Sequence, residues 1–195
     1  LSIELAEDLN KRGVHTDILS MYTESIPGVL IKKQELLRKG IPGVYFLGLN
    51  INPSLSSFVL AVLKLRRIIR MHGYDVVETS QPSLAIMAAC ATKFTRVKHV
   101  AGLHYSGTHK GINRIREFIF ILSAMLIPAT RYYGISQFVV EHWQRRSYAF
   151  GSRLKLVYNS ISDDSFCVES DKGALCKELE ISANSRIILF VGRLD

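Results

Sequence analysis

The sequence has few cysteines, few prolines and no long apolar run, and these scarcities narrow the class of protein. Its 195 residues include three cysteines and five prolines. The cysteines are odd in number and widely spaced, so they offer neither a disulfide framework nor zinc-ligand spacing, and a reducing, cytoplasmic location is expected. The most apolar stretch, residues 118–129, is shorter than the roughly 20 residues that a membrane span needs. It therefore predicts a buried helix.

Acidic residues are scarce in the middle of the chain. Residues 41–160 contain 15 Lys and Arg against 4 Asp and Glu, within a net charge of +8 for the whole chain. Such a surface favours phosphates, acidic lipid headgroups or nucleic acid. The basic residues are spread over several helices without a nucleic-acid-binding signature, so nucleic acid is not an expected partner. The residues concerned are the basic residues of helix 54–71 together with Arg114, Arg116, Arg145 and Arg146. They predict either a solvated face or a surface that docks on an anionic membrane.

What the sequence does contain is a regular alternation of apolar strands and amphipathic helices. The predicted strands are 14–21, 44–49, 75–81, 97–104, 131–136, 153–162 and 186–195. The predicted helices are 1–11, 54–71, 82–94, 112–128, 137–150 and 171–180, and the charged segment 31–39 is either a short helix or an excursion. The connections are short and carry no hairpin signal, which indicates right-handed βαβ units. The expected fold is a doubly wound, mainly parallel, Rossmann-like α/β domain.

Six segments, in chain order, resemble family 4 glycosyltransferases. They are LAEDLNKRGVHTDILSMYT, YDVVETSQPSLAIMAACATK, HVAGLH, YYGISQFVVEHW, KLVYNSISDD and IILFVGRLD. In that family two Rossmann-like domains face each other across a cleft. The first mostly holds the acceptor, and the second holds a nucleotide-diphosphate sugar.

The resemblance implies a domain organisation and a reaction. Residues 1–165 would form the acceptor-side domain without its first strand, and residues 166–195 a linker and the start of the donor-binding domain. The chain is thus expected to be truncated at both ends and inactive by itself. The implied reaction is retaining transfer of a sugar from a nucleotide-diphosphate sugar to a glycan or lipid-linked acceptor, at the inner face of the membrane. No metal or other cofactor is expected.

His104 is the expected catalytic residue. It ends a strand at the carboxyl edge, where ligands bind in open α/β sheets, and it matches a histidine that lies against the donor sugar in the family. A metal site formed with His99 and His109 is not favoured. The five-residue spacing puts His99 and His104 on opposite strand faces, and no carboxylate or thiol joins them at ligand spacing.

Two further sets of residues are expected to bind substrate. The hydroxyl- and glycine-rich loop after His104 precedes a helix N-terminus, where backbone amides can hold phosphate or sugar hydroxyls. Its expected acceptor-binding residues are Tyr105, Ser106, Thr108 and Lys110. The resemblance assigns donor binding to Gly192 and Arg193. It leaves the role of Asn159 open, because Tyr158 and Ser160 depart from the family pattern.

Two other interpretations stay open at this point. One is a non-catalytic Rossmann-like module that binds an anionic ligand or a membrane surface. The other is a dinucleotide-dependent enzyme, whose glycine fingerprint would follow a first strand that the sequence does not show.

Overall fold

The computed structural model describes residues 2–26, 29–50, 53–105, 112–127, 130–160, 172–182 and 184–186. The chain divides into two compact units, Leu1–Asn159 and Ser160–Asp195, which are described separately. The expected domain boundary after residue 165 stays a prediction.

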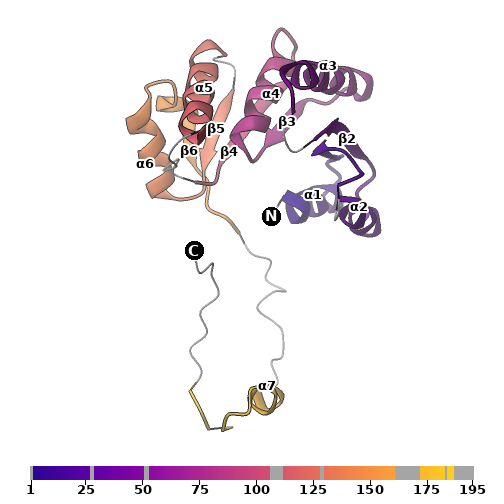
Figure 1. The fold of residues 1–195 in the computed structure, drawn as a ribbon, viewed down its shortest axis with the longest axis vertical. Coiled ribbons are helices and arrows are strands. Elements are labelled where there is room, and N and C mark those ends of the chain that lie inside the picture. Colours follow the sequence, from indigo (N-terminus) through magenta and orange to yellow (C-terminus); the bar gives the residue numbers. More distant parts are fainter. Residues whose placement is uncertain are drawn as a thin grey trace. The chain divides into compact units, whose positions relative to one another are not determined.

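The first unit alternates strands and helices along its whole length (Figure 1). Its strands are β1 (Ile18–Tyr22), β2 (Val44–Leu49), β3 (Val76–Thr79), β4 (Lys98–Leu103), β5 (Arg131–Gly134) and β6 (Leu154–Leu156). Its helices are α1 (Ser2–Lys11), α2 (Val29–Arg38), α3 (Leu55–His72), α4 (Pro82–Thr92), α5 (Ile112–Leu126) and α6 (Gln137–Arg146), with a short 3-10 turn η1 (Gly151–Arg153).

Every strand pairing among the described residues is parallel. β1 pairs with β2, and a second sheet has the order β3-β4-β5-β6. The helices therefore serve as crossovers, which confirms the predicted mainly parallel, Rossmann-like α/β architecture.

Helix α4 connects the two sheets through its small side chains. Met87, Ala88 and Ala91 pack in one apolar cluster with residues of β2 and α3, whereas Ala85 belongs to the cluster under β4 and β5. Because alanine has almost no side chain, the neighbouring elements can approach α4 closely on more than one side. In Figure 1, α3, α4 and α5 form adjacent parts of one helical layer.

An aromatic cluster fills the core between the second sheet and helices α5 and α6. Trp143 of α6 lies edge-on to Phe120 of α5, with ring centroids 5.4 Å apart, and also contacts Phe150. Tyr132 of β5 contacts both phenylalanines. All four side chains are almost fully buried. Their burial fixes α5 and α6 on one face of the sheet.

The predicted boundaries differ most from the structure at three elements, and the other elements agree within about two residues. β1 starts at Ile18 rather than at residue 14, because the Asn10 side chain bonds both the N–H and the carbonyl of Thr16 and holds this segment in a loop. Helix α6 ends at Arg146, four residues early, where the chain turns and buries Phe150. β6 is limited to Leu154–Leu156.

The prediction that residues 118–129 form a buried helix is only half right. The helix exists as α5, and its Phe120 and Ala124 are fully buried. However, Phe118, Leu122 and Leu126 on its other face are exposed. Within the described ranges, no helix has the length and apolar character to cross a membrane.

The second unit contains α7 (Lys172–Glu178), as predicted for residues 171–180, and Cys176 of this helix is buried. Of the predicted closing strand 186–195, only Arg186 belongs to the described residues.

Candidate active site

The candidate active site lies on the face of the second sheet that the aromatic cluster does not occupy. Side chains alternate between faces along a strand. His99, Ala101 and Leu103 of β4 point into the core, so Gly102 and His104 belong to the other face. This arrangement confirms that His99 and His104 lie on opposite faces.

His104 is the central polar group of this face. It follows the last residue of β4 and is half-buried. Its Nε2 atom is buried and has no hydrogen-bond partner among the described residues. Buried polar atoms are nearly always paired, so a nitrogen of this kind is suited to bond a ligand.

A tyrosine–glutamate pair stands beside His104. The Tyr133 ring, from β5, lies edge-on to the His104 ring with centroids 6.2 Å apart. Its hydroxyl donates a 2.9 Å hydrogen bond to Oε1 of Glu78 in β3. The site thus combines a side chain of β3, a side chain of β5 and the residue that follows β4, the strand between them.

Gly102 makes this close arrangement feasible. It pairs with Tyr133 in the β4–β5 register. A Cβ atom built at position 102 would lie 2.5 Å from Oη of Tyr133 and 2.9 Å from Nε2 of His104. The Tyr133 ring can therefore lie over β4 only because residue 102 has no side chain.

The pKa values of both Glu78 and Tyr133 are raised above their ordinary values. Loss of water around its carboxyl group raises the pKa of Glu78, although the residue as a whole remains accessible; the Tyr133 hydrogen bond and the nearby His104 oppose this rise. Burial and the adjacent Glu78 raise the pKa of Tyr133, so its hydroxyl stays protonated and remains a donor. A carboxyl group with a raised pKa beside an imidazole is an arrangement found at functional sites.

Sequence reasoning identified His104 but missed Glu78 and Tyr133. Their signal was present but weak: Glu78 is an acidic residue within the apolar strand DVVETSQ, in a region with few acids. Knowing that it meets Tyr133 requires the strand order, because 55 positions separate them.

Tyr105 is placed differently from His104. Its backbone carbonyl accepts a 2.9 Å hydrogen bond from Nε1 of Trp143, and its ring lies edge-on to the Trp143 ring. Tyr105 therefore anchors the end of β4 to α6. The other expected substrate-binding residues, Ser106, Thr108, Lys110, Gly192 and Arg193, lie outside the described residues, as does His109.

The described residues contain no cluster of three or more side chains able to hold a metal ion. His99 is occupied otherwise: its ring nitrogens each lie 3.0 Å from a threonine hydroxyl, those of Thr79 and Thr130. Burial lowers the pKa of His99 to about 4, so it is a neutral core residue.

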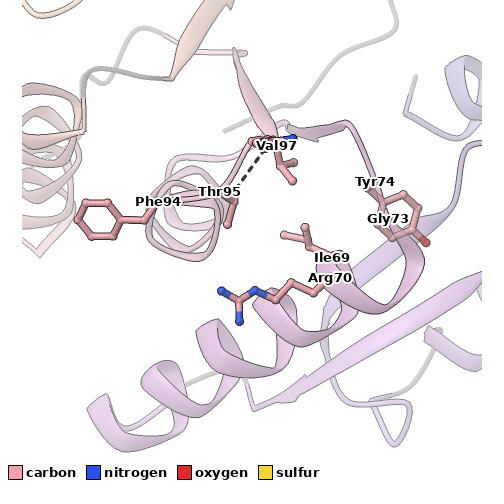
Figure 2. A pocket seen from close by; sticks show the side chains of 8 residues that line it. Ile69, Arg70, Gly73, Tyr74, Phe94, Thr95 and Val97 are labelled. Atoms are coloured by element: carbon pink, nitrogen blue, oxygen red, sulfur yellow. Dashed lines mark hydrogen bonds between the residues drawn. The ribbon is translucent and has the colours of Figure 1, made fainter.

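A hollow of about 500 Å³ lies at the opposite edge of the sheet (Figure 2). Its lining includes Arg70 and Gly73 at the end of α3 and residues 94–97 before β4. Ligands of open α/β sheets bind at the carboxyl ends of the strands, whereas this hollow adjoins their amino ends. The carbonyl-rich ends of α3 and α4 also disfavour anions there. We therefore place the candidate site at His104.

The basic residues named from the sequence divide into two groups. Lys64, Arg67 and Arg70 of α3 are exposed. In α6, Arg145 pairs with Glu141, and Nε of Arg146 donates a 2.7 Å bond to the buried Glu117. Arg146 thus links α6 to α5, and Arg145 forms a solvent-exposed ion pair within α6, so both arginines already have a carboxylate partner. The side chains of Arg114 and Arg116 are outside the described part.

Comparison with known proteins agrees with this architecture. Residues 2–165 match the model of Glycosyltransferase Family 4. Because the match covers most of the chain, the chain belongs to glycosyltransferase family 4. A search of curated proteins found no match.

Solved glycosyltransferase structures share the fold. HepE from Anabaena in complex with UDP has a TM-score of 0.68 at 18% identity, over 92% of this chain and 45% of that one. A glycosyltransferase from Rickettsia africae has a TM-score of 0.64 at 19% identity, over 94% of this chain and 46% of that one. HepE was also crystallised with UDP-glucose; that structure has a TM-score of 0.66 at 18% identity, over 92% of this chain and 45% of that one. The chain thus spans less than half the length of these structures.

Proposed function

We propose that this chain is the acceptor-side part of a retaining glycosyltransferase, which transfers a sugar from a nucleotide-diphosphate sugar to a glycan or lipid-linked acceptor. The observation that carries the proposal is the unpartnered Nε2 of His104 at the carboxyl edge of a parallel sheet in a family 4 chain. The complex of HepE with UDP-glucose supports the choice of donor class.

His104 would act on the donor sugar. A polar group placed against the sugar can stabilise the charge that develops at the anomeric carbon when the diphosphate leaves. Tyr133, held by its hydrogen bond to Glu78, packs against one side of the imidazole ring. Transfer with retention requires the acceptor hydroxyl to approach from the sugar face that the leaving phosphate occupies.

The remaining roles follow the same proposal. The loop residues Tyr105, Ser106, Thr108 and Lys110 would bind the acceptor, and Gly192 and Arg193 would bind the donor diphosphate, where Arg can form charge-assisted contacts. The reaction would proceed without a metal or other cofactor. The protein would work in the cytoplasm, at the inner face of the membrane.

The test is sugar transfer by the complete gene product with a panel of UDP- and GDP-sugars. We expect His104→Ala to reduce turnover about 100-fold, the scale of losing one group that stabilises developing charge, with an unchanged melting temperature. The control is His15→Ala, which removes an exposed histidine before β1. Full turnover by His104→Ala would contradict the role of His104. No cleavage of any nucleotide sugar by the unaltered protein would favour the non-catalytic binding module.

We also propose that residues 1–195 alone do not transfer sugar, since they cover only 45% of the HepE chain. Calorimetry of this chain with UDP-glucose should show no micromolar binding. Micromolar binding would place a donor site within these residues and overturn the division of roles.

A further inference from the structure

Helix α5 carries apolar side chains on two opposite faces. Phe120 and Ala124 are buried against the sheet. A second set recurs at spacings of three and four residues, which defines one stripe along the helix. Its members, 41 to 65% exposed, are Ile115, Phe118, Ile119, Leu122, Met125 and Leu126. We call these six residues the α5 stripe.

An exposed stripe of this length needs an explanation. Single apolar residues on a surface are ordinary, but contiguous apolar patches on soluble proteins mark contact with another protein or with a membrane. A helix with apolar residues on two opposite faces usually has both faces buried, against protein or against lipid.

The loop after α4 extends the stripe with an aromatic and a basic group. Phe94 is 89% exposed and has a φ of 62°, a backbone conformation uncommon for a non-glycine residue. Figure 2 shows its ring pointing away from Arg70 and Tyr74. On its other side, Phe94 lines a small hollow together with Leu126 of the stripe. Lys93 Nζ lies 5.2 Å from the Phe94 ring centroid, and Arg96 is also exposed.

The neighbouring helix α3 repeats this combination. Its exposed residues include Leu60 and Leu63 in the first half and Arg67 and Arg70 in the second. Helices α3 and α5 both flank α4 in one layer (Figure 1). Helices that lie in a membrane interface typically combine exposed apolar residues with neighbouring lysine and arginine residues.

We propose that the α5 stripe, with Phe94, Lys93 and Arg96, docks this protein on an anionic phospholipid bilayer. The apolar side chains would enter the boundary between headgroups and acyl chains, and the two cations would meet lipid phosphates. A second copy is a poorer occupant, because each copy carries a net charge of +8, which an anionic bilayer would instead attract. The proposal rests on this surface and does not depend on sugar transfer.

The experiment is flotation of the gene product with vesicles of phosphatidylcholine, either alone or with about 30 mol % phosphatidylglycerol, a content that gives an anionic surface. We expect binding to the anionic vesicles that weakens with added salt. Phe118→Ser should reduce the partition coefficient about tenfold, since a buried phenylalanine side chain is lost from the interface. Phe138→Ser is the matched control, because Phe138 of α6 is 67% exposed against 65% for Phe118.

The charge contribution has its own pair of variants. Replacing both Lys93 and Arg96 by Gln should lower binding to anionic vesicles about 30-fold, because each basic residue near the surface contributes roughly 1 kcal/mol. Lys155→Gln, at an exposed position of β6, should leave binding unchanged.

Three results would overturn the proposal. The first is no binding to either kind of vesicle, and the second is vesicle binding that Phe118→Ser does not weaken. The third is a dimer that light scattering detects without lipid and that Phe118→Ser dissociates. The last would assign the stripe to a second copy. Vesicle binding is measured without any sugar, so its failure is distinct from failure of the transferase proposal.

Discussion

His99 shows how a single buried side chain makes stability depend on pH. It is 3% exposed and bonded to two threonines, and burial lowers its pKa to about 4. The unfolded chain binds a proton below about pH 6.5, whereas the folded chain does not until about pH 4. The unfolded state therefore binds more protons in this interval, and stability falls as pH decreases through it.

We expect His99 to contribute a loss of up to about 3 kcal/mol in unfolding free energy between pH 6.5 and 4. Urea titrations across this range should show a shallower pH dependence in His99→Gln than in the unaltered protein, even if its stability at neutral pH is lower. The comparison removes the contribution of carboxylates, which both proteins share. Equal slopes in the two proteins would contradict the assignment.

Gly102 provides the second residue-scale prediction. In Gly102→Ala, the new methyl would collide with Oη of Tyr133 and Nε2 of His104, so the Tyr133–Glu78 hydrogen bond should break. We expect a loss of about 1–3 kcal/mol in stability, the range for overpacking, and a larger relative loss of nucleotide-sugar turnover. Gly151→Ala is the control, because a Cβ there meets nothing within 4 Å. Equal turnover in the two variants would mean that the arrangement around His104 is not needed.

At the scale of elements, the boundaries that could be predicted were those set by local chemistry. Helix α3 begins after Ser54, whose Oγ accepts a bond from the Ser57 N–H, and ends at Gly73 in the left-handed conformation. Both signals are visible in sequence. The end of α6 was not, because it is set by the burial of Phe150 in a distant core.

The sequence predicted one residue of the candidate site, His104, but not the pair of side chains beside it. His104 ends an apolar strand, so its place followed from one segment. The Glu78–Tyr133 pair required the lateral order of β3, β4 and β5, which periodicity within single strands does not contain. The exposed face of α5 was missed because composition alone does not say which apolar residues are covered.

Helix α4 carries the element-scale prediction. Ala88 is fully buried where α4 meets α3 and β2. We expect Ala88→Val to destabilise the protein by about 1–3 kcal/mol, because the added methyl groups overpack this contact. Ser83→Val, at an exposed position of the same helix, tests whether the effect comes from helix propensity. Chemical denaturation of both variants separates the two causes, and equal losses would rule out overpacking.

At the scale of the whole molecule, the described strands form two parallel sheets, β1-β2 and β3-β4-β5-β6. Ligands of open α/β sheets bind beyond the carboxyl ends of the strands. Glu78 belongs to β3, at one edge of the second sheet, and His104 follows the neighbouring strand β4. The carboxyl edge of this sheet, where the unpartnered His104 lies, is therefore the expected ligand side.

The hydrogen bond between Trp143 and Tyr105 makes the intrinsic tryptophan fluorescence sensitive to the segment beside His104. Trp143 is the only tryptophan of the 195 residues, and its indole N–H is tied to the backbone carbonyl next to His104. Indole emission responds to the loss or bending of that bond. Any ligand that moves the His104–Tyr105 segment should therefore change the fluorescence of the unlabelled protein.

Titrating the gene product with UDP-glucose, and subtracting the signal of Trp143→Phe, should give a saturable emission change with the dissociation constant found by calorimetry. Calorimetric binding without a Trp143 signal would show that the ligand leaves this segment in place. If the emission change is observed, Trp143, a core residue of α6, reports whether the site beside His104 is occupied.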